Sequence, residues 1–562
     1  MKSDDMKKFE RTVGVGRRPA ASLLMPLLLV ALLHAHTRGH TPAPTPAQKQ
    51  SGGAVAAAGA RKPPPPEKIV GDYVKAVGGK KLLAQLRDAT YEWSVVGTQA
   101  DSAQARTHLK SPASARTDIN VGGVETNAAA SPASAWARGA DGLLRTLTDR
   151  EAYAAKLRAA LDATRLLDFK KQKILARTAG LEQVAGERAY VVEFSTRAGA
   201  RLRYYFGADT HLLLKTVDDA GGLTQTFSDY RADAEGRPLE PHRVVVEREG
   251  APALTLALRE ARYNTNLPET LFDAPGDPGL SVPALLRELA RNQDEDDKRI
   301  DDYTFTLKET ERKLNDRGEV TKEEVNVYEV YPVANYGWVM KQTVEKGVPL
   351  SAERAAKEEK RVAEELQKAE REAPKNVEKR ARRKAEREAK RRRQGADSPK
   401  ADDEEDEGDV DISTFLRASE FVSPRRERFR ERDAIVFDFR PRPGFKPSNQ
   451  GETIASKLVG TVWVDPVDRQ VMRLEGRLTD SFKMAGGLAL SVKPGAAFVF
   501  EQTRLPEGVW LPRFSQVNAS AKVFLFAGIT VNETNEFSDY KRFSTKAGDA
   551  TLNTPEAPQK KP

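Results

Sequence analysis

The chain has 562 residues, 39% hydrophobic and 31% charged, and this length predicts roughly two to four domains rather than one core. The formal net charge is +9. Residues 1–18 supply +3 of it and leave +6 for the rest, which predicts no nucleic-acid partner in a chain without a nucleic-acid-binding motif. The absence of cysteine excludes disulfides, thiolate metal sites, cysteine nucleophiles and a lipidated N-terminal cysteine.

The N-terminus is typical of an export signal. Basic residues precede an apolar run, Ala20–Leu33, and small residues follow it, which predicts a signal peptide over residues 1–35 with cleavage after Ala35. The run is shorter than the about 20 residues of a membrane span, so an uncleaved, tilted anchor is the alternative. Residues 36–66 are rich in Pro and Ala and predict a linker. We therefore expect a protein of the periplasm or cell envelope.

A first domain is predicted over residues 67–279. It opens with a helix that ends at Gly78 and a second short helix that runs to about Leu86, and a longer helix is predicted over Arg150–Leu167. The small, polar residues of Val121–Ser131 predict a loop. Period-two alternation predicts strands at Thr90–Gly97, Tyr190–Phe194, Arg201–Phe206, His211–Thr216, Leu223–Tyr230, Arg243–Glu247 and Leu254–Leu258.

A second domain is predicted over residues 280–547, followed by a disordered tail over residues 548–562. It repeats the plan of the first domain, with a helix at about Pro283–Ile300 before its strands. About five further strands in Gly460–Phe543 form an antiparallel meander. The other predicted strands are Tyr303–Lys308, Glu323–Tyr331, Gly337–Lys346 and Ile435–Arg440.

A charged insertion over residues 351–411 interrupts the second domain. Ser351–Gln394 is helix-forming, contains few large apolar residues, and is interrupted by Pro374; an acidic block follows at Asp402–Asp411. A solvated helix whose basic end is neutralised by the acidic block is the favoured interpretation. Docking on an anionic membrane surface or an envelope protein is the alternative. The residues that would dock are Arg380, Arg382, Arg383, Lys384, Arg391, Arg392 and Arg393.

The two domains contain an internal repeat. In the first domain, GERAYVVEF, RLRYYFG and HLLLKT parallel RDAIVFDF, GTVWV and QVMRLEG of the second, and EGRPLEPHRVVV parallels EGVWLPRFSQV. The tetrapeptide FSDY occurs at Phe227–Tyr230 and again at Phe537–Tyr540. It is out of register with this pairing, so we interpret that identity as coincidence.

The residue types disfavour catalysis. His34, His36 and His40 lie in the leader, His108, His211 and His242 are scattered, and no HExxH, GxSxG or P-loop spacing occurs. We therefore expect no enzyme, cofactor or metal. Aromatic residues on predicted strands belong either to ordinary sheet core or to a concave apolar ligand surface. The candidate ligand-binding residues are Trp93, Tyr204, Phe206, Trp463, Phe498, Phe500 and Phe524.

Three segments of the first domain occur in a familiar order: GDYVKAVGGKKLLAQLRDATYEWSVVG, then GLEQVAGERAYVVEF with RYYFGADTHLLLKT, then LPETLF. In this order they resemble the lipoprotein-sorting carrier superfamily (LolA/LolB-like). The second domain is similar to a related group of exported bacterial proteins through YEVYPVANYGWVMKQTVEKG, VWVDPVDRQVMRLEG, GVWLP and FSDYKRF. The resemblance covers most of residues 67–545. It implies a sheet curled into a half-barrel around a helix, with a hydrophobic concavity that binds acyl chains or lipoproteins.

The sequence therefore predicts an α+β protein with two tandem antiparallel half-barrel (LolA-like) domains, each with helices packed on a curved sheet, plus a long charged helical insertion. The expected function is non-catalytic binding of a lipid, an acyl chain or another apolar ligand. The alternative is an envelope scaffold or sensor that acts through protein or anionic-surface contacts of the charged helix over residues 351–394.

Overall fold

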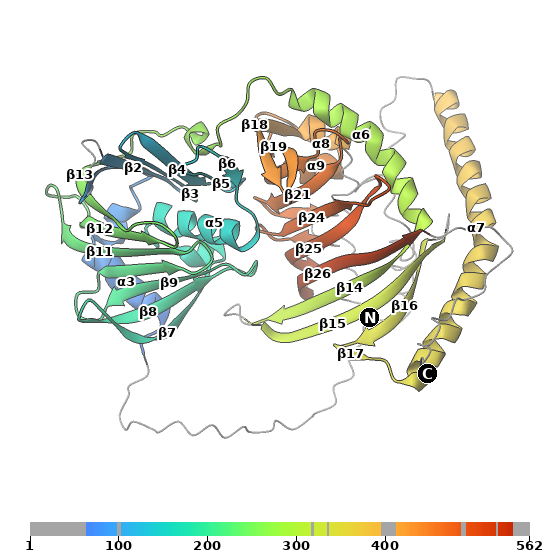
Figure 1. Cartoon of the computed structure of the whole chain (residues 1–562), viewed down its shortest axis with the longest axis horizontal. Coiled ribbons are helices and arrows are strands. Elements are labelled where there is room, and N and C mark those ends of the chain that lie inside the picture. Colours follow the sequence, from blue (N-terminus) through green and yellow to red (C-terminus); the bar gives the residue numbers. More distant parts are fainter. Residues whose placement is uncertain are drawn as a thin grey trace, which may run out of the picture.

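The computed structural model describes residues 63–97, 103–315, 320–333, 337–394, 412–484, 490–523 and 527–542. Most of them form two antiparallel sheets of 13 strands each, β1–β13 and β14–β26, and helices pack on both sheets (Figure 1). The predicted α+β class with two tandem antiparallel sheets is confirmed. In the described part of the chain, no helix is long and apolar enough to cross a membrane.

The first domain has three helices and two short 3-10 turns among its described residues. These are α3 (Pro66–Ala76), α4 (Gly79–Leu83), α5 (Asp149–Ala163), η1 (Phe169–Gln172) and η2 (Glu269–Phe272). Its strands are β1 (Asp88–Val96), β2 (Ala103–Lys110), β3 (Ser114–Val121), β4 (Val124–Ala130), β5 (Ala135–Arg138), β6 (Leu144–Thr146), β7 (Leu175–Val184), β8 (Glu187–Ser195), β9 (Arg201–Gly207), β10 (Leu213–Asp218), β11 (Leu223–Arg231), β12 (Glu240–Arg248) and β13 (Leu254–Tyr263).

The second domain has four helices and one 3-10 turn among its described residues. These are α6 (Val282–Arg299), η3 (Ile300–Asp302), α7 (Ala352–Gln394), α8 (Ile412–Ala418) and α9 (Gln450–Ala455). Its strands are β14 (Tyr303–Leu314), β15 (Val320–Val333), β16 (Gly337–Glu345), β17 (Val348–Pro349), β18 (Ser419–Phe429), β19 (Arg432–Pro441), β20 (Leu458–Val464), β21 (Val471–Leu478), β22 (Phe482–Met484), β23 (Leu490–Val492), β24 (Ala497–Arg504), β25 (Trp510–Val523) and β26 (Ala527–Arg542).

The two sheets share one topology. The strand order is β6-β5-β4-β3-β2-β1-β13-β12-β11-β10-β9-β8-β7 in the first and β17-β16-β15-β14-β26-β25-β24-β21-β20-β19-β18 in the second. In each, the chain runs to one edge, crosses through helices (α5, or α7 and α8) to the other edge, and returns to pair its last strand with its first. The charged insertion is therefore the topological counterpart of α5.

This shared order confirms the predicted repeat. Strands β8, β9, β10 and β12 occupy the same positions as β19, β20, β21 and β25, which is the pairing that the sequence predicts. The two FSDY copies lie in β11 and β26, which are not counterparts, because the counterpart of β26 is β13. The interpretation of that identity as coincidence is confirmed.

The predicted loop at Val121–Ser131 is wrong, because most of it is strand β4, between β3 and β5. Its small residues have a packing role. Ala130 of β4 and Ala135 of β5 contact Ala152 and Ala159 of α5, so that the helix lies close to the sheet. Alanine is mildly depleted in strands, so it does not predict one. Here the strand is favoured by contact with α5, which is distant in sequence.

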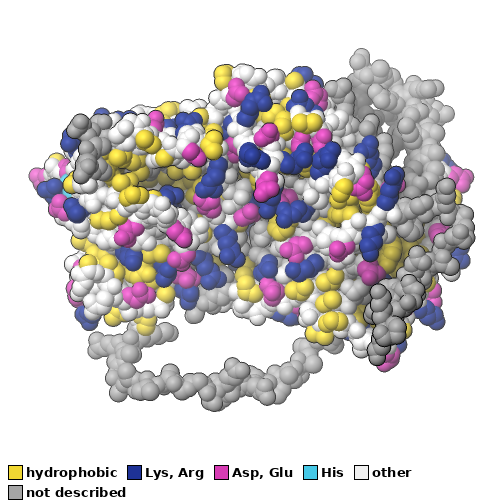
Figure 2. Space-filling view, viewed as in Figure 1, with side chains coloured by type: hydrophobic (Ala, Val, Ile, Leu, Met, Phe, Trp, Pro, Cys, Tyr) yellow, Lys and Arg dark blue, Asp and Glu magenta, His cyan; other side chains and the backbone are white. Residues whose placement is uncertain are grey.

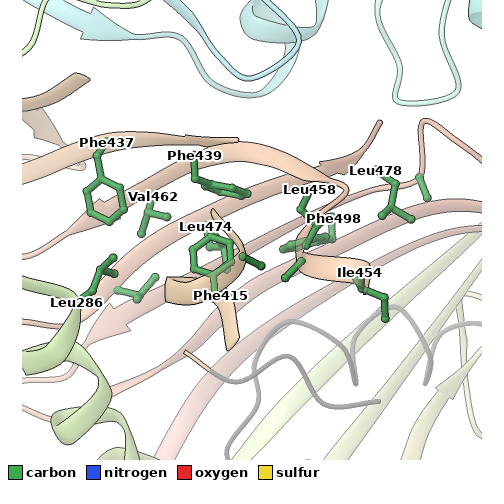
Figure 3. Packing of buried hydrophobic residues seen from close by; sticks show 14 of the residues in the cluster. Leu286, Phe415, Phe437, Phe439, Ile454, Leu458, Val462, Leu474, Leu478 and Phe498 are labelled. Atoms are coloured by element: carbon green, nitrogen blue, oxygen red, sulfur yellow. The ribbon is translucent and has the colours of Figure 1, made fainter. Parts of the chain in front are cut away.

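Helices fill the concave face of the second sheet. Figure 3 shows Phe437 and Phe439 of β19 packed with Phe415 of α8 and Leu286 of α6. The ring centroids of Phe415 and Phe439 are 4.7 Å apart. The long helix α7 lies outside this core, on β15 and β16, where Val362 and Ala369 contact Val339. The predicted interruption at Pro374 is wrong, since α7 continues through it.

The outer face of the second sheet packs against the first domain. Arg425 Nη2 donates to Thr146 Oγ1 at 2.6 Å, and the Thr146 N–H donates to Glu427 Oε2 at 2.7 Å. Arg473 Nη2 lies 2.8 Å from Asp149 Oδ1 at the N-terminus of α5. These charged residues of β18 and β21 are almost fully buried, so the two domains share a buried polar junction.

Candidate functional site

The concavity of the first sheet is crossed by α5. This helix contacts β2–β5 on one side and β9 on the other. Its larger apolar residues, Leu157 and Leu161, pack against β8, β9 and α3 rather than against the central strands of the sheet. The central strands β1, β11, β12 and β13 therefore form a floor beneath α5 that the apolar side of the helix does not cover.

The floor is apolar. Trp93, Leu256 and Leu258 are buried in a cluster of their own on adjacent strands β1 and β13, with Val95 and Val244 beside them. The partly buried members of this cluster are Phe227, Val246, Leu254, Ile119, Leu109, Ala103, Ala261 and Tyr263. Figure 2 shows hydrophobic side chains gathered in a recess on the half of the molecule that the first domain forms. A cluster of partly exposed apolar side chains on a concave face is the usual lining of a ligand site.

Charged side chains lie on α5 and on the turn that follows it. Arg158 and Asp162 are one helical turn apart on α5, and Arg165 follows the C-terminus of the helix, with a positive φ. Arg158 forms an ion pair with Asp218 at the end of β10. The Tyr204 hydroxyl donates to Asp162 Oδ1 at 3.1 Å, and Arg165 Nη2 donates to the Tyr91 hydroxyl at 3.2 Å. The concavity thus has an apolar floor and a charged roof.

One carboxylate enters the concavity from the floor. Glu240 Oε1 accepts hydrogen bonds from the hydroxyls of Tyr91 at 2.8 Å and Tyr263 at 3.0 Å. Burial raises the pKa of Glu240, while Arg165 and the two tyrosine hydroxyls act against that shift. Burial also raises the pKa of both tyrosines, which therefore remain hydroxyl donors at neutral pH.

Burial raises the pKa of Asp162 from the ordinary 3.8 to about 6, against the opposing effects of Arg158 and the Tyr204 hydroxyl. A carboxyl whose folded pKa is raised stabilises the fold most below its unfolded pKa, and that contribution is lost as pH rises through the folded value. We expect Asp162→Asn to raise the free energy of unfolding of the first domain by about 1–2 kcal/mol at about pH 8. At about pH 4 the gain should vanish. Urea unfolding at both pH values tests this; an equal gain at both would contradict it.

Three of the predicted ligand-binding residues lie on the inner face of the first sheet. Trp93 belongs to the floor, and its indole N–H donates to Thr107 Oγ1 at 3.2 Å. Tyr204 and Phe206 are buried in a different cluster, on β9 with α5 and α3, where Phe206 contacts Tyr73 with ring centroids 5.4 Å apart. Their role in ligand binding stays a prediction.

The other four predicted residues belong to the second sheet, and the structure does not bring them together. Phe498 lies in the concave core, Phe500 is buried on the same strand, and Phe524 lies outside the described residues. Trp463 lies on the opposite, outer face, in a cluster with Val436 and Met472. Alternation along one strand fixes which residues share a face, but the concave face is chosen by contacts with α6, α8 and α9.

The predicted surface-binding residues lie in the second half of α7. Arg382 is exposed there, and the side chains of Arg380, Arg383, Lys384, Arg391, Arg392 and Arg393 lie outside the described residues. Their role stays a prediction.

The second concavity contains a small pocket. About 150 Å³ opens between α6 and β19, lined by Leu280, Val282, Leu285, Glu288, Ile435 and Arg469. Ligand sites usually measure about 300–1,000 Å³, so this pocket is small for a lipid.

One group of carboxylates could hold a cation. Oxygen atoms of Glu309, Glu311 and Glu533 lie within 4.8 Å of one another on β14 and β26. Asn535 Nδ2 already donates to Glu533 Oε1 at 2.8 Å. Acidic groups at a sheet surface are common without an ion, so we assign no metal to them.

Sequence reasoning missed the polar roof and Glu240. Part of the signal for the roof is present in the sequence, because Arg158 and Asp162 form a polar stripe on an alanine-rich helix and Arg165 follows its end. Such a stripe ordinarily faces solvent. Its position over the sheet becomes visible only when α5 is seen to cross the concavity.

No protein-family model matches the chain, and no curated protein matches it. Among solved structures, a DUF1329 family protein from Desulfovibrio piger is 16% identical over 37% of this chain and 96% of that one, with a TM-score of 0.25. A LolA superfamily protein from Nitrosomonas europaea is 11% identical over 36% and 97%, with a TM-score of 0.24. The Mycobacterium tuberculosis lipoprotein LppX is 10% identical over 37% and 100%, with a TM-score of 0.15.

The chain is thus similar to a protein of the superfamily that its sequence resembles, over a stretch the size of one domain. To that extent the predicted resemblance is confirmed. At these identities and TM-scores the ligands of those proteins do not transfer to this chain. The fold itself rests on the strand order and the position of the helices.

Proposed function

We propose that the first domain binds a lipid or another apolar ligand, without catalysis, in the concavity between α5 and strands β1, β11, β12 and β13. The observation that carries the proposal is the difference in polarity between the apolar floor and the charged roof. The floor is apolar and partly exposed at Phe227, Val246 and Leu254, yet the side chain that reaches it from the end of α5 is the charged Arg165, which donates to Tyr91 of β1.

Burial of apolar surface is favourable by roughly 25 cal/mol per Å². A helix whose purpose is to complete a core therefore presents its apolar side to the sheet. α5 directs that side at β8 and β9, toward one edge of the sheet, and at α3, rather than at the central strands. Phe227, Val246 and Leu254 are left partly exposed, and a ligand would complete their burial.

The proposal that the site is non-catalytic rests on the hydrogen-bond partners of His108 and His242. His108 Nδ1 lies 3.0 Å from Thr90 Oγ1, and His242 Nε2 lies 2.7 Å from Asp233 Oδ1. His108 has a hydroxyl as its partner and His242 a carboxylate, and among the hydrogen bonds of the described residues neither histidine joins a hydroxyl and a carboxylate in one triad-like arrangement.

We also propose export to the cell envelope, which rests on the N-terminal sequence. Residues 1–35 lie outside the described residues. Cell fractionation of the full chain, with N-terminal sequencing of the product, tests this part separately from ligand binding.

Native mass spectrometry of the purified chain tests the binding proposal directly. We expect a co-purifying apolar ligand, or saturable binding of a fluorescent fatty acid to the ligand-free protein. Absence of both would refute the proposal.

Phe227→Ala is expected to weaken binding of that probe about tenfold, because an aromatic side chain on the floor contributes on the order of 1.5–3 kcal/mol when a ligand buries it. Leu181→Ala is the matched control, since Leu181 is 49% exposed on β7 and lies away from the floor. Titration of both variants compares the loss of apolar surface inside and outside the concavity. Equal affinities would place the probe elsewhere.

A further inference from the structure

Two guanidinium groups flank one tyrosine ring at the end of the concavity that lies under the C-terminus of α5. Arg165 Cζ lies 5.7 Å from the centroid of the Tyr263 ring, and Arg237 Cζ lies 5.1 Å from it. The carboxylate beside them is Glu240, whose Oε1 already accepts two tyrosine hydroxyls. Asp162 also lies near Arg165, and Asp233 is bonded to His242 and 44% exposed. Positive and negative groups are therefore both present at this end of the concavity, with the two guanidinium groups on the tyrosine ring.

Arg165 has hydrogen-bonding capacity to spare. A guanidinium carries five N–H donors in a planar fork. Arg165 Nη2 donates to Tyr91, but its Nε is buried and has no hydrogen-bond partner among the described residues. Buried donors without partners are rare in folded proteins, and arginine forks are suited to carboxylate and phosphate oxygens.

The same end of the site leads directly onto the apolar floor. Tyr91 stacks on Trp93 with ring centroids 6.0 Å apart, and Trp93 pairs with Leu258 across β1 and β13. A molecule whose polar end reaches Arg165 would therefore lay its chain along Trp93 and Leu258.

We propose that the ligand of the first domain is an amphiphile with an anionic oxygen head group, a carboxylate or a phosphate ester, and that Arg165, assisted by Arg237, binds this head. The inference rests on the proposed function and adds the chemical class of the ligand. The tail is held by the floor and the head by the arginines, so a neutral chain of equal length binds more weakly.

The test is displacement of a fluorescent fatty acid from the full chain by laurate, dodecyl phosphate, methyl laurate or inorganic phosphate. Laurate and dodecyl phosphate should compete about tenfold better than methyl laurate, equivalent to about 1.4 kcal/mol. Inorganic phosphate should not compete. In Arg165→Gln both anionic amphiphiles should fall to the level of methyl laurate, whose own affinity stays unchanged.

Two further variants keep the outcome interpretable. Arg237 is exposed, so Arg237→Gln should leave the fold intact and lower the preference for laurate about two- to threefold. Arg203, on β9 and paired with Asp219, gives the matched control Arg203→Gln, with the preference unchanged.

Equal affinity of the unaltered protein for laurate and methyl laurate would overturn the head-group inference and leave the proposed function standing. Displacement by inorganic phosphate would overturn it as well, since the site would then bind a free anion. If no chain displaces the probe, or no probe binds, the proposed function itself fails.

Discussion

Replacing Arg473 by methionine is expected to lower the free energy of unfolding of the second domain by about 3–5 kcal/mol, the cost of removing one partner from a buried ion pair. Arg473 is fully buried on β21, between Glu475 and Glu501. Its guanidinium also lies 5.8 Å from the centroid of the Trp463 ring. Methionine fills the space, but it leaves two buried carboxylates without their central cation.

Arg513→Met is the matched control, because Arg513 Nη1 lies 3.0 Å from Glu501 Oε2 but the Arg513 side chain is 45% exposed. A surface ion pair contributes about 0–1 kcal/mol, so this variant should unfold almost like the unaltered protein. Urea unfolding followed by tryptophan fluorescence measures both, since Trp463 and Trp510 report on the second domain. Equal destabilisation by the two variants would show that burial of Arg473 is not the cause.

Arg473 also connects the domains through Asp149 at the start of α5. The roof of the candidate site is therefore anchored at one end by the second sheet and at the other by Arg165 and Tyr91. The second domain therefore supports α5, the helix that crosses the first concavity, while its own concavity is packed with helices. The sequence alone does not reveal this arrangement.

The fold was largely predictable because its signals are local. Period-two alternation identified strands such as β9 and β19. β4 was not predicted because its alanines do not alternate with polar residues. α8 was not predicted because it is a single short helix after the charged insertion. Both owe their conformation to contacts with distant elements, α5 for β4 and β19 for α8.

The candidate site was predictable only in part, for the same reason. Trp93 could be placed on an apolar strand face, and that face does line the concavity. Trp463 has the same local pattern, yet its face is covered by Phe429 and Arg473 on the outside of the second sheet. Alternation separates two faces, whereas curvature and helix packing decide which one is concave.

Gly460→Ala is expected to destabilise the second domain by about 2–3 kcal/mol, since this position of β20 has no space for a methyl group. A Cβ there would lie 1.9 Å from the carbonyl oxygen of Glu475 on β21 and 2.7 Å from Phe439 Cζ. The carbonyl belongs to the paired strand, so it can move only if β20 and β21 separate. Phe439, which packs on Phe415, would have to shift as well.

Gly180→Ala on β7 provides the comparison, because a Cβ at Gly180 meets no atom within 4 Å. Its effect should stay within about 0.5 kcal/mol, and a strand alanine is entropically preferred to glycine. Urea unfolding of each domain measures the two substitutions. A small effect at Gly460 would mean that β20 and β21 adjust freely. That would contradict the close approach of the two strands, and with it the tight packing of Phe439 against Phe415.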